Sequence, residues 1–113
     1  MRDIQTKADI ELLVNSFYSK LLLEEELAPV FRDINMEQHI PHIVHFWSFV
    51  LLDEEGYKTN VFDKHLSLPI QPHFFDTWLR IFLLTVNELF SGEIAEMAKT
   101  RATSLTYTFK SKW

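Results

Sequence analysis

The sequence contains no cysteine. Disulfide bonds, thiolate catalysis, cysteine-ligated zinc and iron–sulfur clusters are therefore excluded. Glycine is also scarce, with two residues, and proline occurs four times. So few turn-forming residues argue against an all-β protein with many tight turns.

An excess of positive charge is absent as well. Lysine and arginine number 11 against 16 aspartate and glutamate residues, which gives a formal net charge of −5. Nucleic acid and anionic membrane both require a basic face on their partner. Neither is therefore expected as a main partner of this protein.

Long apolar runs are missing too. The first residues lack the apolar core of a signal peptide, and runs such as Ile81 to Leu84 are far shorter than the ~18 residues that span a bilayer. We therefore expect a soluble cytoplasmic protein.

Aromatic side chains, by contrast, are abundant. They make up 14% of the residues and include ten phenylalanines, within an apolar total of 47%. A chain of 113 residues buries about 65% of its unfolded surface, and we expect one domain over residues 1–113. The large apolar side chains indicate a core that wraps a bound group or packs unusually large residues.

The first predicted helix begins after Thr6, because Thr6 and Asp9 have the spacing of a capping box. It extends to about Leu23, with its apolar residues on one side. Pro29 is then suited to open a short helical turn that directs Phe31 inward.

Asn35 is expected to cap a second helix that ends near Leu52. Pro41 lies close to the start of this helix, so we expect a kink or a late helix start there. The next residues, Asp53 to Asp63, are polar and have no sustained period, which predicts a loop.

A third helix is predicted to begin at Pro72. Its apolar residues recur at spacings of three and four and share one stripe, formed by Phe75, Trp78, Phe82, Thr85, Val86 and Leu89. Ser91 and Gly92 indicate a stop, and a last helix is predicted over Glu93 to Phe109. Its apolar side is expected to carry Ile94, Met97, Ala98, Arg101, Leu105 and Phe109. The fold class predicted from these elements is all-α.

Three histidines, His39, His42 and His45, follow one another at intervals of three. Their directions fan over roughly 120°, and no H-E-x-x-H motif or acidic third ligand accompanies them, so a zinc site is not favoured. At ~100° per residue, His39 lies on the core face of its helix, whereas His45 is expected to face water.

Four side chains on different segments are candidates for a functional site: Tyr18, His39, His65 and Trp78. A histidine placed just before a helix with an indole in its buried face is a suitable frame for a flat apolar ligand bound through a metal. Each residue also has a plainer interpretation. Tyr18 and His39 can be satisfied side chains at the core edge, His65 a surface or capping residue, and Trp78 part of the core.

The order and surroundings of these residues resemble the truncated haemoglobins, specifically the third group of that family. The resemblance covers most of the chain and rests on a combination of short motifs. These are Phe17-Tyr18, Leu27-x-Pro29-x-Phe31, His39 eight residues before Trp47, and His65-Leu66-x-Leu68-Pro69 followed by Phe74-Phe75-x-x-Trp78. One departure is the segment Tyr57-Lys58-Thr59-Asn60-Val61, where relatives often read Tyr-x-Gly-x-Pro.

The resemblance implies a shortened globin fold, with helices packed two-over-two around haem b. The haem would be bound non-covalently, since the C-x-x-C-H attachment motif is absent. His65 would be the proximal iron ligand, and Tyr18, His39 and Trp78 would line the distal side. The walls of the haem pocket implied in this way are Phe31, Ile43, Phe46, Trp47, Phe62, Leu68 and Ile81.

Three functions from different classes follow. The first is a binder of oxygen, nitric oxide or carbon monoxide, in which the Tyr18 O–H and the Trp78 N–H hold oxygen tightly. Such tight holding suits storage or sensing better than oxygen transport. The second is a haem enzyme for nitric oxide dioxygenation or peroxide chemistry. It would need an external reductase, because the chain has no flavin or nicotinamide motif. The third is a helical interaction module without haem.

Overall fold

The computed structural model describes residues 1–32, 34–53 and 72–112, and every regular element within these ranges is a helix. The all-α prediction is confirmed. Three of the predicted site residues, Phe62, His65 and Leu68, lie outside the described residues.

Helix α1 spans Lys7–Leu21 and ends two residues earlier than predicted. Its N-terminus has the predicted capping box: the Thr6 side chain accepts a hydrogen bond from the Asp9 N–H, and the Asp9 carboxylate accepts one from the Thr6 N–H at 3.0 Å. Asp9 also accepts hydrogen bonds from the Gln5 N–H at 2.8 Å and from the Arg2 guanidinium. The buried carboxylate of Asp9 therefore joins the N-terminal segment to the first turn of α1.

These contacts give Asp9 a stabilising role that depends on pH. Its hydrogen bond from Arg2, together with those from the Gln5 and Thr6 N–H groups, outweighs the opposing effect of burial and lowers the pKa of Asp9 to about 2. Because the folded-state pKa is depressed, the contribution is present above the unfolded value of ~3.9 and is lost as the pH falls towards the folded value.

We expect Asp9→Asn to lower the free energy of unfolding by about 1 kcal/mol at neutral pH, the usual effect of losing a helix cap. The difference from the wild type should shrink as the pH falls below ~4, where the Asp9 carboxylate begins to protonate. Urea unfolding at a series of pH values measures both quantities, with Glu11→Gln on the exposed side of α1 as the control. An undiminished difference in acid would show that the charge of Asp9 is unimportant.

Helix α2 is a single turn, Ala28–Phe31, with Pro29 in its first turn as predicted. Helix α3 spans Met36–Leu52, and the Asn35 side chain accepts a hydrogen bond from the Glu37 N–H at 3.0 Å. The helix begins before Pro41 and continues through it, so the late start is not observed. The Asn35 cap fixes the first turn ahead of the proline, whose ring lies on the exposed side.

Helix α5 spans Pro72–Leu89 and helix α6 spans Glu93–Lys112, three residues beyond the predicted end. Gly92, between them, has a φ of +141°, as its predicted role in the stop requires. A Cβ atom at Gly92 would also lie 2.5 Å from Cγ of Asp3. The Asp3 carboxylate accepts hydrogen bonds from the N–H groups of Ile94 and Ala95 at 2.9 and 2.8 Å. The N-terminal segment therefore caps α6.

The buried face of α6 differs in part from the predicted one, because Ala98 and Phe109 are buried as expected but other members are not. Its buried residues are Ala95, Ala98, Ala102, Thr106 and Phe109, whereas Arg101 is exposed and Met97 is 38% exposed. The prediction followed the largest apolar side chains. The three alanines are small, so α6 approaches the core closely along their side, and the larger residues are left at the edge.

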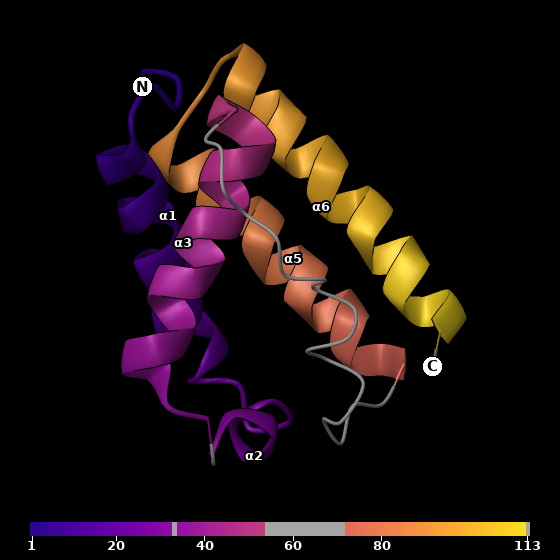
Figure 1. Cartoon of the computed structure of the whole chain (residues 1–113). Coiled ribbons are helices and arrows are strands. Elements are labelled where there is room, and N and C mark those ends of the chain that lie inside the picture. The colour runs from indigo at the N-terminus through magenta and orange to yellow at the C-terminus, as the bar shows by residue number, and fades with distance from the viewer. Residues whose placement is uncertain (33, 54–71, 113) are drawn as a thin grey trace.

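The long helices form two antiparallel pairs, α1 with α3 and α5 with α6 (Figure 1). Helix α1 also packs against α5, which joins the two pairs. This is the two-over-two arrangement of helices implied by the resemblance. Within the described ranges, no helix has both the length and the apolar character needed to cross a membrane.

Candidate functional site

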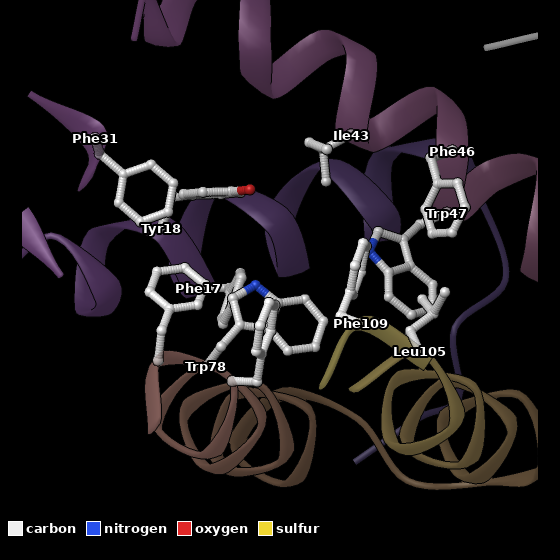
Figure 2. Close-up of a pocket in the computed structure, with 11 residues that line it drawn as sticks. Phe17, Tyr18, Phe31, Ile43, Phe46, Trp47, Trp78, Leu105 and Phe109 are labelled. Carbon is white, nitrogen blue, oxygen red and sulfur yellow. The ribbon is translucent and has the colours of Figure 1, made fainter. Parts of the chain in front are cut away.

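An aromatic-lined cavity of about 40 Å³ lies between the helices (Figure 2). The five helices of the described residues all contribute to its wall. Eight of the lining side chains are hydrocarbon only: Phe17, Phe31, Ile43, Phe46, Phe74, Phe75, Leu105 and Phe109. The other three, Tyr18, Trp47 and Trp78, each add one polar atom to an apolar ring system.

The polar atoms of these three side chains face the cavity. Figure 2 shows the Tyr18 oxygen and the indole nitrogens of Trp47 and Trp78 pointing into the space between the labelled rings. Trp47 is only 2% exposed and Trp78 is half-buried. No residue in the described ranges accepts a hydrogen bond from either indole N–H. Both groups are therefore available to a molecule inside the cavity.

The orientation of the two indoles is fixed by Phe82, which is completely buried in α5. The Phe82 ring stacks on Trp47 with centroids 4.9 Å apart and on Trp78 with centroids 5.5 Å apart. Phe17 contacts the edges of Trp78 and Phe82 at 5.4 and 5.3 Å. Stacked and edge-to-face aromatic pairs stabilise one another beyond the area they bury. The core thus holds both N–H groups towards the cavity.

Tyr18 is held by a polar partner outside the cavity wall. Its hydroxyl lies 2.8 Å from Nε2 of His39 on α3, within hydrogen-bond distance. The Tyr18 ring is 4% exposed and also packs edge-to-face against Phe31, 5.7 Å away. Burial raises the pKa of the Tyr18 hydroxyl, so this group remains protonated at any physiological pH.

The structure brings three of the four predicted site residues together. Tyr18 and Trp78 line the cavity, and His39 is bonded to Tyr18. The fourth, His65, lies outside the described residues. The Tyr18 hydroxyl is thus satisfied by a histidine side chain from another helix.

Four of the predicted wall residues line the cavity: Phe31, Ile43, Phe46 and Trp47. Ile81 is buried but is not one of the lining residues, and its carbonyl accepts a hydrogen bond from the Thr85 hydroxyl. His45 is half-buried rather than exposed to water. In the part of the chain that the structure describes, no group of three histidine, aspartate or glutamate side chains could hold a metal ion.

Five lining residues were not identified as such from the sequence: Phe17, Phe74, Phe75, Leu105 and Phe109. Phe75, Leu105 and Phe109 had been assigned to helix faces, and Phe17, Phe74 and Phe75 belong to the short motifs. Periodicity indicates which side of a helix is buried but does not distinguish core from cavity wall, so it could not separate these residues. The motifs were the available indication for the three phenylalanines that they contain.

Comparison with known proteins identifies this arrangement of helices. A family model described as bacterial-like globin matches residues 3–110. The chain therefore belongs to the bacterial-like globin family. Membership of the globins implies a haem-based function in ligand binding.

The more specific resemblance is to the third group of truncated haemoglobins. The chain is 31% identical over 108 residues to the group 3 truncated haemoglobin of Campylobacter jejuni, covering 89% of this chain and 85% of that protein. The crystal structure of a group III truncated haemoglobin from Campylobacter jejuni matches with a TM-score of 0.88 and 28% identity, over 99% of this chain and 94% of the other. The resemblance inferred from the short sequence motifs is thus confirmed.

A more distant structure shows the same fold. The truncated haemoglobin of Tetrahymena pyriformis, in its Fe(III) form, matches with a TM-score of 0.75 and 20% identity, over 91% of this chain and 89% of that one. The two-over-two arrangement is therefore retained in a protein whose sequence differs at most positions.

Proposed function

We propose that this protein binds haem b non-covalently, with His65 as the axial ligand of the iron, and that it holds oxygen or another diatomic molecule in the aromatic-lined cavity. The observation that carries the proposal is the convergence of the Tyr18 hydroxyl and two indole N–H groups on one small apolar cavity. Few polar groups in a mainly apolar wall are typical of sites for small molecules.

The lining residues suit the chemistry of a porphyrin. Eight hydrocarbon side chains offer flat or branched apolar surface to a flat apolar macrocycle. The cavity of about 40 Å³ has the size of a small molecule such as a diatomic gas rather than of a porphyrin. Entry of haem therefore requires the aromatic rings to separate.

Haem, held by His65, would supply an iron atom capable of binding a diatomic ligand. The chain's own contribution is to donate hydrogen bonds to that ligand and to exclude water from it. The Tyr18 O–H and the Trp78 N–H are donors fixed in a dry site, so they need little reorganisation when negative charge develops on the ligand. At ~1–2 kcal/mol each, two such bonds slow ligand release by roughly ten- to a thousandfold. This favours storage or sensing of the ligand over its transport.

The same donors favour a second function, nitric oxide dioxygenation or peroxide chemistry with an external reductase. Trp47 adds a second N–H, and so a third donor, to the cavity, and a polar distal pocket stabilises charged species and assists bond cleavage. Consumption of nitric oxide or peroxide when a reductase and haem-loaded protein are supplied together would establish this activity. If the protein binds the diatomic ligand reversibly and consumes neither nitric oxide nor peroxide, the function is storage or sensing of the ligand.

Titration of the purified protein with hemin tests the proposal. We expect a Soret band that saturates at one haem per chain, together with quenching of the fluorescence of Trp47 and Trp78, which line the cavity. Bovine albumin serves as a reference for non-specific hemin uptake. A fully helical preparation that shows neither change would refute the proposed function.

A further inference from the structure

The aromatic-lined cavity has two sides, and each carries its own hydrogen-bond donors. Figure 2 shows Tyr18 and Trp78 towards one side of the cavity, and Trp47 and Leu105 towards the other. The two donors assigned above to a bound diatomic ligand, the Tyr18 O–H and the Trp78 N–H, belong to the first side. The Trp47 N–H is the donor of the second side, and it points into the space between the rings (Figure 2).

The Trp47 N–H is a buried donor without an acceptor. The side chain is 2% exposed, and no residue in the described ranges accepts a hydrogen bond from its nitrogen. Its ring is held in place, because it stacks on Phe82 with centroids 4.9 Å apart and contacts the edge of Phe46 at 5.3 Å. A buried polar group without a partner costs free energy. A guest molecule that accepts this hydrogen bond is therefore stabilised in the cavity.

The cavity has room for more than one small molecule. Its volume is about 40 Å³, whereas one water molecule needs roughly 10–15 Å³ of such space. The cavity is thus about three times larger than one guest of that size requires. A diatomic molecule beside Tyr18 and Trp78 therefore leaves free volume near Trp47.

The side chains near Trp47 favour a neutral guest. An indole N–H is a donor only, and the hydrocarbon side chains of Phe46, Leu105 and Phe109 offer no acceptor. A water molecule usually needs roughly two to four hydrogen-bond partners, and an anion would lose its hydration in exchange for one hydrogen bond. A neutral diatomic molecule has neither requirement. It can accept the N–H weakly while the rest of its surface contacts the apolar rings.

We propose that the cavity has a second position for a neutral diatomic molecule, at the Trp47 N–H between α3 and α6, apart from the position at Tyr18 and Trp78. This inference rests on the proposed function and deepens it, since both concern the same cavity. A ligand that leaves the first position waits at the second and returns instead of escaping to water. Two different diatomic molecules, such as oxygen and nitric oxide, can also occupy the cavity together, as nitric oxide dioxygenation requires.

Proton–nitrogen spectra of the haem-loaded protein saturated with carbon monoxide test for the second position, because this form is diamagnetic. The first position is then full, so a higher pressure of carbon monoxide can fill only further positions. We expect the Trp47 indole resonance, identified by its absence from Trp47→Phe, to shift with pressure and reach a plateau. The same pressure of added helium should leave it in place. A Trp47 resonance that does not respond, or that responds equally to both gases, would overturn the proposal.

Filling the space while keeping the donor gives a second test. Leu105→Phe adds bulk on the side of the cavity that carries Trp47, so it should abolish the pressure dependence of the Trp47 resonance. Leu84→Phe makes the same chemical change on the exposed side of α5 and should retain that dependence. A shift of wild-type size in Leu105→Phe would show that the added gas lies elsewhere, and the proposal would fail.

Rebinding of carbon monoxide after flash photolysis measures the effect of the N–H itself. A molecule held at Trp47 returns within the cavity at a rate that is independent of the carbon monoxide concentration. Trp47→Phe keeps an aromatic ring but removes the N–H, so the share of ligand that returns in this way should fall about two- to threefold, the low end for one hydrogen bond. Tyr107→Phe removes an exposed O–H from α6 and should not change this share. An unchanged share in Trp47→Phe would contradict the role of the N–H.

Failure of this inference can be told apart from failure of the proposed function. A protein that takes up no haem would refute the proposed function itself. A haem-loaded protein that binds carbon monoxide, but whose Trp47 resonance is insensitive to added gas, would refute only the second position.

Discussion

Replacement of His65 with alanine is expected to abolish stoichiometric haem binding. An imidazole is a suitable axial ligand for haem iron, the chain has no cysteine thiolate, and the sequence places His65 just before the helix that carries Trp78. Removing it should leave the aromatic cavity intact while removing the bond to iron. The Soret band at one equivalent of hemin should then fall to the level of non-specific uptake.

Two further variants make the result specific. His73→Ala changes another histidine, exposed at the start of α5, and should leave the Soret band at its wild-type intensity. His65→Gly leaves space for a free imidazole, so adding imidazole should restore haem binding. A normal five-coordinate ferrous spectrum in His65→Ala would refute the axial assignment.

Truncation of Phe82 to alanine should cause a large loss of stability. The Phe82 ring is completely buried and lies between the indoles of Trp47 and Trp78. Deleting a buried aromatic ring typically costs about 3–5 kcal/mol, through lost burial and the cavity left behind. The midpoint of urea unfolding would fall accordingly, and native stability is commonly only ~5–15 kcal/mol.

The same substitution should loosen the cavity. Without the stacked ring, the two indole N–H groups lose the contact that fixes their orientation, so oxygen should leave faster even in molecules that remain folded. Leu84→Ala, on the exposed side of the same helix, is the matched control and should cost below ~1 kcal/mol. A cost for Phe82→Ala as small as that for Leu84→Ala would show that the stack is not important for stability.

Local chemistry made the helix ends predictable from the sequence. The capping box of Thr6 and Asp9, the Asn35 cap and the stop at Gly92 all involve residues close together in the chain, and each is confirmed. The face of α6 was predicted only in part, because small alanines rather than large side chains mark most of its buried side. Packing distance between helices is not encoded in the hydrophobic period of one helix.

The sequence indicated which residues gather at the candidate site, but it did not indicate how their side chains contact one another. Short motifs identified Tyr18, His39 and Trp78, and the structure brings these residues together. The hydrogen bond between Tyr18 and His39 joins residues 21 positions apart on different helices, and the direction of the Trp47 N–H depends on its stacking against Phe82. Such relations arise only when helices pack, so a pattern in one segment could not reveal them.

The cap that Asp3 provides for α6 also has a consequence for the order of folding during synthesis. Asp3 contacts residues 91 and 92 positions further along the chain, so this contact must wait until the start of α6 has left the ribosome. Contacts of such long range form late because closing a long loop is entropically costly. The contact of Asp3 therefore forms only when α6 has emerged, whereas the hydrogen bonds from Arg2 and Gln5 to Asp9 are local and can form together with α1.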